Sequence, residues 1–310
     1  MANQVFIVGH KNPDNDSIAA AVSYAYLKNA LEAKKAEPEA EYVACCLGPL
    51  PQESATILEQ VGLPAPKLIE KVGEGDKVIL VDHNESTQMV DGIADAEIVE
   101  VVDHHRIAGD VVTGNPILYL NIPVGSTATI VSKLYEQLNV EVTPAIATVL
   151  LSAIMTDTVI TKSPTCTDYD LVQAEKLGAI IGKKPTEFGL EVFKMRGGDN
   201  DLSVEELCTH DSKEFKKGDE VYMVAQHETV TLDVAMEREA EYREFLKKKV
   251  AENGYKFALL LITDIFNEGS TFICEGDVAP VSEAFGIDAT KAEWVDGILS
   301  RKKQVIPPLS

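Results

Sequence analysis

Acidic and imidazole side chains directly follow three short apolar segments of this chain. They occupy His10 to Asp16, Asp82 to Glu85, and Asp103 to His105. Carboxylate oxygens and imidazole nitrogens are ligands for divalent cations. If the apolar segments are neighbouring parallel strands, their C-terminal ends lie at one edge of a sheet. The acids and histidines would then converge on one site, although they are far apart in the chain.

The first of these segments places His10, Asp14 and Asp16 within one loop, which can turn all three side chains toward one point. The same loop contains Asn-Pro-Asp-Asn, which is also typical of an ordinary turn. The Asp-His sequences at the other two strand ends favour a functional site. So does the position of four of the six histidines within these segments. The remaining two, His210 and His227, are expected to be surface or core residues.

Asp157 follows an apolar stretch and offers a further carboxylate. An acid there can also be a simple polar boundary of a helix, so it becomes a ligand candidate only together with the other residues. The metal-ligand candidates are His10, Asp14, Asp16, Asp82, His104 and Asp157. These mixed donors suit two cations that share Asp82 and Asp157, and Mn²⁺ matches both donor types. Such a pair can bind a bridging water, lower its pKa and support hydrolysis at phosphorus.

Arg301, Lys302 and Lys303 form a basic run in a strongly acidic chain. The sequence has 28 Lys and Arg against 50 Asp and Glu, a formal net charge of −22. This charge disfavours nucleic acids, because it repels phosphodiester backbones. The basic run is either a solvated tail or a local site for phosphate groups. Arg binds phosphate bidentately, and Lys binds it as a point charge.

The composition predicts a cytoplasmic globular protein that does not bind membranes. Hydrophobic residues make up 45% of the 310 residues. The five cysteines form no Cys-x-x-Cys pair, which favours free thiols in a reducing compartment. The N-terminus does not resemble a signal peptide, and no apolar run is long enough to span a bilayer.

The hydrophobic pattern alternates between strand and helix in the first half of the chain. Strands are predicted over 5–8, 42–47, 77–81 and 97–102. Helices are predicted over 17–31, 52–61, 126–138, 144–155, 168–182 and 185–194. Asp16 or Ser17 is the expected N-cap of the first helix. Continuous apolar strands with helical connections predict a parallel sheet with right-handed crossovers.

A linker over 195–201, rich in Gly and polar turn formers, separates two predicted domains. The first domain, 1–194, carries the metal-ligand candidates, and the second spans 202–310. Elements predicted in the second domain are a strand over 220–230, a helix over 234–253, and strands over 256–266 and 271–275. The expected fold class is therefore α/β with two domains.

Five motifs of the chain resemble those of family II inorganic pyrophosphatases, within the DHH phosphoesterase superfamily. They are GHKNPDND (9–16), VDHNE (81–85), DHH (103–105), SPTCTD (163–168) and SRKKQV (300–305). The resemblance implies a parallel-sheet DHH domain, a smaller C-terminal α/β domain of the DHHA2 type, and an active site in the cleft between them. It also implies hydrolysis of pyrophosphate to two phosphates, and a homodimer formed through the N-terminal domain.

The resemblance further implies how the metal ions are bound. One ion would be held by His10, Asp14, Asp82 and Asp157. The other would be held by Asp16, Asp82, His104 and Asp157. Both ions would be Mn²⁺ or Co²⁺, and Mg²⁺ would arrive with the substrate.

Roles toward the substrate follow from the same resemblance. Pyrophosphate would be bound by His105, Lys213, Arg301 and Lys302. The catalytic residues would be His105, Asp82 and Asp157. Of these, His105 would face the substrate and pass a proton to the leaving phosphate.

Two other functions remain open at this point. A DHH-type phosphodiesterase or exopolyphosphatase would act on short nucleotides or polyphosphate. The net charge and the lack of a Gly-rich nucleic-acid motif in the second half count against it. A non-catalytic module that binds metal or phosphate is the third possibility. The complete ligand set and the basic run count against that reading.

Overall fold

A six-stranded sheet occupies the first half of the chain. In this computed structural model, which describes residues 3–196, 202–209, 211–218 and 220–309, the strand order is β3-β2-β1-β4-β5-β6. The strands are β1 (Asn3–Val8), β2 (Ala40–Cys46), β3 (Lys67–Leu68), β4 (Lys77–Val81), β5 (Glu97–Asp103) and β6 (Leu118–Asn121). All neighbouring strands run parallel, which confirms the predicted sheet.

The strand order reverses between β1 and β4, which are neighbours without being consecutive. Val8 at the end of β1 pairs with Leu80 of β4. Val81 at the end of β4 pairs in turn with Val102 of β5. The carboxyl ends of these three central strands are therefore level. Residues that follow them start from one edge, at the point where doubly wound sheets bind their ligands.

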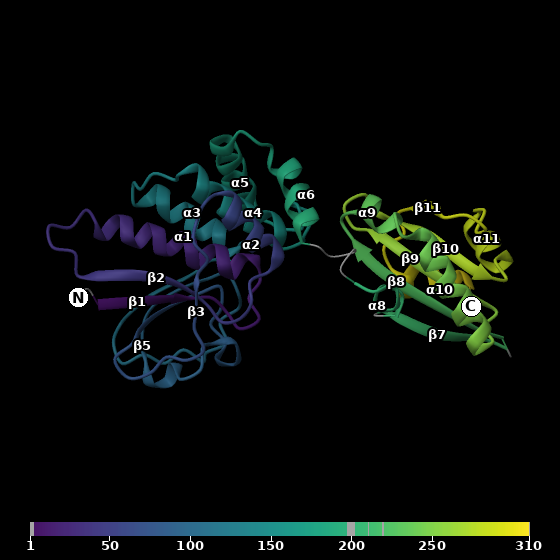
Figure 1. Cartoon of the computed structure of the whole chain (residues 1–310), viewed down its shortest axis with the longest axis horizontal. Helices are drawn as coiled ribbons and strands as arrows, with labels where there is room; N and C mark the ends of the chain where they lie inside the picture. The colour runs from purple at the N-terminus through teal and green to yellow at the C-terminus, as the bar shows by residue number, and fades with distance from the viewer. Residues whose placement is uncertain (1–2, 197–201, 210, 219, 310) are drawn as a thin grey trace. The chain divides into compact units, whose positions relative to one another are not determined.

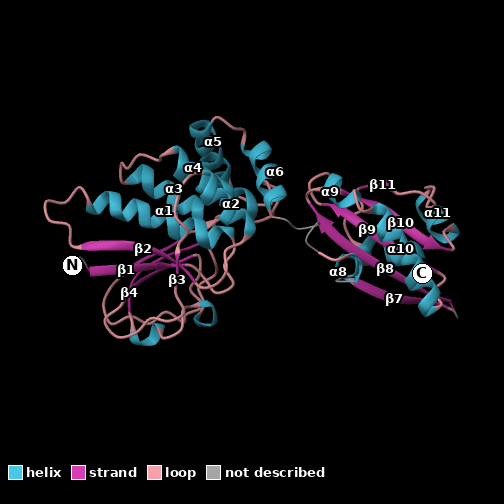
Figure 2. Ribbon diagram, in the orientation of Figure 1, coloured by secondary structure: helices cyan, strands magenta, loops and turns pink. Residues whose placement is uncertain are grey.

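Helices cover one side of this sheet, as Figures 1 and 2 show. They are α1 (Asn15–Glu32), α2 (Gln52–Gln60), α3 (Thr127–Gln137), α4 (Pro144–Asp157), α5 (Asp168–Ile181) and α6 (Pro185–Met195). The first helix begins at Asn15, and its N-cap is Asp14, whose carboxylate accepts a hydrogen bond from Ser17 N–H at 2.9 Å. The expectation of Asp16 or Ser17 as the N-cap was therefore wrong, and Asp16 lies in the first turn.

The other side of the sheet is covered by connecting segments. Val72, Met89 and Val90 from these segments are buried together with Val8 and Leu80 of the sheet. Two short 3₁₀ turns, η1 (Ser86–Gln88) and η2 (Ile93–Asp95), lie in the connection between β4 and β5. These segments give the strands a second apolar contact, which explains why their sequences are continuously apolar.

A second, mixed sheet forms in the C-terminal part, in the order β11-β10-β9-β8-β7. Its strands are β7 (Ser212–Lys217), β8 (Glu220–Thr229), β9 (Phe257–Asp264), β10 (Gly269–Gly276) and β11 (Glu293–Asp296). The β8–β9 pair is parallel, and the other pairs are antiparallel. Both faces are covered, since Tyr242 and Leu246 pack in one buried cluster and Val281 and Leu309 in another.

The helices of this part are short except for one. They are α8 (Val204–Thr209), α9 (Leu232–Met236), α10 (Glu239–Asn253), α11 (Ala279–Phe285), η3 (Arg301–Val305) and α12 (Ile306–Leu309). The prediction of a single helix over 234–253 was wrong, because the helical structure is interrupted between α9 and α10. At the break, the Arg238 guanidinium donates to the carbonyl of Leu202 at 2.7 Å, a contact that local sequence does not reveal.

Two compact units divide the chain, Met1–Arg196 and Gly197–Ser310. Most of the predicted linker, residues 197–201, lies outside the described residues. In the part of the chain that the structure describes, no helix has the length and apolar character needed to cross a bilayer.

Candidate metal centre

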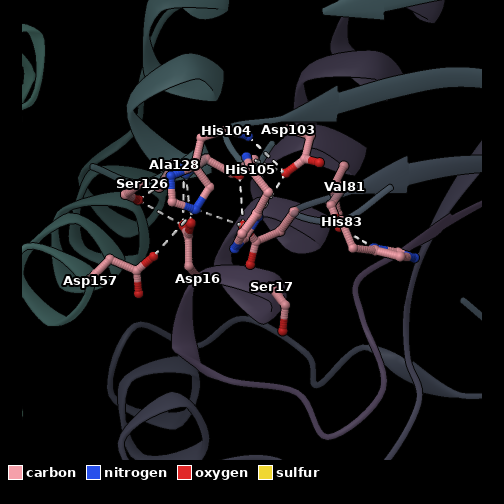
Figure 3. Close-up of polar contacts among 12 residues, drawn as sticks. Asp16, Ser17, Val81, His83, Asp103, His104, His105, Ser126, Ala128 and Asp157 are labelled. Carbon is pink, nitrogen blue, oxygen red and sulfur yellow. Dashed lines mark hydrogen bonds and ion pairs between the residues drawn. The ribbon is translucent and has the colours of Figure 1, made fainter. Parts of the chain in front are cut away.

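The predicted metal ligands come from the level strand ends of the first unit. His10 and Asp14 lie in the loop between β1 and α1, and Asp16 lies in the first turn of α1. Asp82 follows β4, and its backbone is left-handed, with a φ of 63°. His104 follows β5, and Asp157 is the last residue of α4. Figure 3 shows Asp16, His104 and Asp157 directed toward one another.

These side chains form three overlapping groups whose ligand atoms lie within 4.8 Å of one another. The groups are His10 with Asp14 and Asp82, Asp16 with His104 and Asp157, and Asp82 with His104 and His105. The structure therefore brings together all six residues that the sequence singled out as metal-ligand candidates.

Asp82 connects the two sides of the cluster through its two carboxylate oxygens. Its Oδ2 lies 3.5 Å from His10 Nε2, and its Oδ1 lies 3.4 Å from His104 Nε2. Asp14 Oδ1 lies 3.4 Å from His10 Nε2 on one side, and Asp157 Oδ2 lies 3.9 Å from His104 Nε2 on the other. The Asp82 side chain is only 1% exposed, so its oxygens are held between the two histidines.

The backbone orients both histidines in the same way. His10 Nδ1 lies 2.8 Å from the carbonyl of Lys11, and His104 Nδ1 lies 2.8 Å from the carbonyl of Val124. Because a carbonyl only accepts, each Nδ1 carries a proton and each neutral ring directs an Nε2 lone pair into the cluster. His104 Nε2 is buried without a hydrogen-bond partner among the described residues. In the neutral ring, the lone pair of this Nε2 lies beside carboxylates, where it would fit a cation.

Asp16, Asp82 and Asp157 have strongly shifted pKa values in the absence of a cation. Burial, followed by the charge of Asp82, raises the pKa of Asp16 to about 7. Burial and the charge of Asp16 raise the pKa of Asp157 well above its ordinary value. Burial also disfavours the charge of Asp82, but its contacts with His10 and His104 outweigh this effect and lower its pKa. Acids crowded in this way repel one another unless a cation lies between them.

The two histidines respond in the opposite direction to the same crowding. Burial lowers the pKa of His10, but the contacts with Asp14 and Asp82 outweigh it and raise the pKa to about 11. Burial likewise lowers the pKa of His104, and its contact with Asp82 raises it to about 9. Without a cation, both imidazoles therefore carry a second proton at neutral pH. This proton is on Nε2, the atom that a metal ion would otherwise bind.

His105 is held by a buried carboxylate next to the cluster. Its Nδ1 lies 2.9 Å from Asp103 Oδ1, and this hydrogen bond raises the pKa of His105. Asp103 is fully buried and also accepts hydrogen bonds from Asn84 Nδ2 at 2.6 Å and from His104 N–H at 2.7 Å. The His105 side chain is 51% exposed. It can therefore meet a ligand from solution while Asp103 stabilises its protonated form.

The start of α3 contributes residues that the sequence reasoning missed. Ser126 Oγ and Ala128 N–H donate to Asp16 Oδ1 at 2.8 and 2.9 Å, and Thr127 N–H donates to Oδ2 at 2.6 Å. Thr127 Oγ1 donates to Asp82 Oδ1 at 2.8 Å. The signal in the sequence was Gly-Ser-Thr before a helix, which marks a helix N-terminus with free N–H groups.

His83 follows β4 next to Asp82, but its side chain is not directed into the metal cluster (Figure 3). In Figure 3 its ring lies apart from that of His104. Its Nδ1 lies 2.8 Å from the carbonyl of Val81, and burial lowers its pKa. Together with His10, Asn84 and His105 it lines a cavity of about 290 Å³ beside the cluster.

The predicted substrate-binding residues of the C-terminal part lie in the second unit. Lys213 is an exposed residue of β7, opposite Val224 of β8. The Arg301 guanidinium is buried and paired with Asp211. The side chain of Lys302 lies outside the described part of the chain.

An open parallel sheet, Asp and His clusters at its carboxyl edge and a second, mixed sheet are features of the DHH class of two-domain proteins. Residues 4–154 match the family model described as the DHH family, N-terminal domain, and residues 190–310 match that of the DHHA2 domain. The chain is 39% identical over 310 residues to the manganese-dependent inorganic pyrophosphatase of Bacillus subtilis, covering 99% of this chain and 98% of that one.

Other relatives agree. The manganese-dependent inorganic pyrophosphatase of Methanothrix thermoacetophila is 38% identical over 314 residues, covering 100% of this chain and 98% of that one. A crystal structure from Methanococcus jannaschii, assigned to family II inorganic pyrophosphatases, matches with a TM-score of 0.60 and 35% identity, covering 98% of each chain. The chain therefore belongs to the manganese-dependent, or family II, inorganic pyrophosphatases, which confirms the resemblance and places it among the hydrolases.

Proposed function

We propose that this chain hydrolyses inorganic pyrophosphate to two phosphates at the cluster on the carboxyl edge of the first sheet. The observation that carries the proposal is the position of Asp82 between His10 and His104, with one carboxylate oxygen toward each. That arrangement offers two neighbouring sets of ligands on either side of Asp82, which both sets can share. The names of its relatives support Mn²⁺ as the cation and pyrophosphate as the substrate.

Two Mn²⁺ ions per subunit, or Co²⁺ in their place, fit the donors that this cluster presents. The first would be held by His10, Asp14, Asp82 and Asp157. The second would be held by Asp16, Asp82, His104 and Asp157. The buried, unpaired Nε2 of His104 and the raised pKa values of Asp16 and Asp157 support this assignment. When bound, such a pair would supply activation of a bridging water and neutralisation of phosphoryl oxygens.

His105 is the proposed general acid. Its Nδ1 is occupied by Asp103, so in the protonated ring the proton on Nε2 remains for a ligand. In hydrolysis, the oxygen of water bonds to one phosphorus while the bridging oxygen departs with the other phosphate. His105 would protonate that departing oxygen, and Asp103 would stabilise the imidazolium before the transfer.

Lys213, Arg301 and Lys302 of the second unit are the proposed binding groups for the two phosphates. Pyrophosphate carries several negative charges, and a chain with net charge −22 needs local cations to hold it. Arg and Lys would also stabilise charge that develops on the departing phosphate. We further propose that the active protein is a cytoplasmic homodimer formed through the first unit, and that Mg²⁺ enters with pyrophosphate.

Phosphate release by the purified, Mn²⁺-loaded protein from pyrophosphate, tripolyphosphate and a dinucleotide would test this proposal. We expect pyrophosphate to be turned over fastest. Faster turnover of tripolyphosphate or of the dinucleotide would instead indicate an exopolyphosphatase or a phosphodiesterase. Stoichiometric Mn²⁺ binding without hydrolysis of any of the three would indicate a non-catalytic module.

A further inference from the structure

Arg301 is fixed by an ion pair with Asp211, outside the candidate metal cluster. Its Nη2 donates to Asp211 Oδ1 at 2.7 Å, and its Nη1 donates both to the carbonyl of Asp211 and, at 3.4 Å, to the carbonyl of Val224. The Arg301 side chain is only 8% exposed, whereas that of Asp211 is 50% exposed. Asp211 therefore holds Arg301 from the solvent side, at the start of β7.

The backbone of Arg301 is anchored to the same place. Its N–H donates to Gln226 Oε1 at 3.0 Å, and Gln226 Nε2 donates to the carbonyl of Leu299 at 3.0 Å. Gln226 N–H in turn donates to the carbonyl of Asp211 at 3.0 Å. Asp211 and Gln226 thus bind Arg301 at both its side chain and its main chain, which leaves the guanidinium few orientations.

The contacts of Asp211 use one edge of the guanidinium and leave another. Arg has five N–H donors in a rigid plane, and two of its edges can each bind two oxygens. Asp211 takes the edge formed by Nη1 and Nη2. No acceptor among the described residues contacts Nε of Arg301. Among the described residues, the edge formed by Nε and the outer N–H of Nη2 therefore has no acceptor, and its geometry matches two oxygens of a phosphate group.

Lys213 is aligned with Arg301 by the same pair of strands. It lies two residues after Asp211, and in the β7–β8 register it is opposite Val224, whose carbonyl accepts from Arg301. Lys213 is exposed. Asp211 thus pairs with Arg301 at the start of η3 and precedes the exposed Lys213 of β7 by two residues.

We propose that Asp211 is a positioning residue that orients Arg301 for binding one phosphate of pyrophosphate. This role rests on the proposed function. The carboxylate restricts the guanidinium to one plane before the substrate arrives, so less conformational entropy is lost on binding. It makes no contact with the substrate itself. Loss of Asp211 would therefore weaken substrate binding while leaving the metal cluster in the first unit intact.

The test compares Asp211→Asn, Asp211→Glu and Asp288→Asn in the full-length, Mn²⁺-loaded protein. Asp288 is a matched control, because its carboxylate pairs with Lys291 at 2.8 Å in the same unit. We expect Asp211→Asn to raise KM for pyrophosphate about tenfold, the usual effect of weakening a charge-assisted contact, with kcat changed less than about twofold. Asp211→Glu should recover part of this loss, and Asp288→Asn should leave both constants unchanged.

A double-mutant cycle separates positioning from general stability. If Asp211 acts through Arg301, adding Asp211→Asn to Arg301→Ala should raise KM no further, since the oriented group is already absent. Equal effects of Asp211→Asn in the presence and absence of Arg301 would overturn the proposal. So would a KM within about twofold of the wild type. A wild-type protein that does not hydrolyse pyrophosphate would instead overturn the proposed function, and this inference with it.

Discussion

The backbone around His10 and His104 orients both rings as their proposed role as metal ligands requires. Each donates Nδ1–H to a carbonyl at 2.8 Å and turns Nε2 toward Asp82. A ring held in this way presents its lone pair without first losing rotational freedom. In the metal-free chain, the acids beside each ring draw a proton to that nitrogen. Protons and cations therefore compete for the same atoms.

This competition predicts that Mn²⁺ affinity rises between about pH 5 and about pH 9. The pKa of Asp16 is raised to about 7 and that of His104 to about 9, so both hold protons that Mn²⁺ must displace. Titration calorimetry in two buffers of different ionisation enthalpy should show proton release on Mn²⁺ binding at pH 7. Affinity and proton release that do not vary with pH would contradict the assignment of these ligands.

The same shifts have a consequence for folding. The pKa values of Asp16 and His104 are higher in the folded chain than in the unfolded chain, so the folded state binds protons more strongly. The metal-free protein should lose stability as the pH rises from about 4 to about 9, first through Asp16 and then through His104. Thermal unfolding followed across this range should show a falling Tm, and saturating Mn²⁺ should reduce the slope. A Tm that rises between about pH 4 and about pH 9 would contradict the raised pKa values of Asp16 and His104.

Asp157→Asn tests the proposed bridging acid that the sequence identified least directly. The substitution keeps the shape of the side chain but replaces a charged ligand by a weak neutral one. We expect Mn²⁺ content to fall and turnover to drop by about a hundredfold or more, since ligand geometry and charge are both lost. Asp168→Asn, at an exposed position on α5, is the control. Unchanged metal content in Asp157→Asn would exclude it from the site.

At the scale of elements, two features bring the proposed metal ligands together. The first is the level ends of β1, β4 and β5, where Val8 pairs with Leu80 and Val81 with Val102. The second is the N-terminus of α3, whose N–H groups bind both oxygens of Asp16. A helix N-terminus favours negative charge, so it partly offsets the cost of burying this acid.

Thr127→Val tests the contribution of α3. Valine keeps the branched shape and the N–H contact to Asp16 but removes the hydroxyl that donates to Asp82 Oδ1 at 2.8 Å. We expect a loss of Mn²⁺ affinity of about 10–100-fold, as is typical of groups that orient metal ligands. Thr148→Val is the matched control, because its hydroxyl donates only to the carbonyl of Pro144 in α4. Equal affinities in the two variants would show that Thr127 is not needed.

At the scale of the whole molecule, the chain separates two kinds of chemistry into two compact units. The first unit gathers carboxylates and imidazoles, and the second carries the cations Lys213 and Arg301. Under the proposed function, the acids of the first unit would bind metal ions and the cations of the second unit would bind phosphate.

Arg301→Ala should therefore affect substrate binding much more than metal binding. We expect KM for pyrophosphate to rise about tenfold or more, with Mn²⁺ content unchanged. Arg243→Ala is the control, since Arg243 is a partly buried arginine of the same unit that pairs with Glu239 and Glu275. It should lower Tm without raising KM. Equal losses of metal and of substrate binding in Arg301→Ala would indicate a structural role.

The proposed homodimer can be checked by mass. One chain is 33.7 kDa, so light scattering coupled to size-exclusion chromatography should give 2 × 33.7 = 67.4 kDa. A mass of 33.7 kDa at micromolar concentration would contradict a stable dimer.

The amino-acid sequence by itself determined the parallel sheet and all six metal-ligand candidates, because the sheet and the candidates can each be recognised from local sequence patterns. Apolar runs predict strands, and Asp and His directly after them are readable without knowing the fold. The two-residue strand β3 is too short to show any periodicity, and at the break between α9 and α10 Arg238 contacts Leu202, which is distant in the chain. Such elements could not be predicted from their own residues.

Only the tertiary structure decided how these residues support one another. Ser126 and Thr127 reach Asp16 and Asp82 across 110 and 45 residues of chain, and Asp211 reaches Arg301 across 90. A hydrogen bond forms between any donor and acceptor that the fold brings within reach, and nothing in the neighbouring sequence marks its partner. The ligand types were therefore evident in the sequence, whereas their orientation and charge were set by packing.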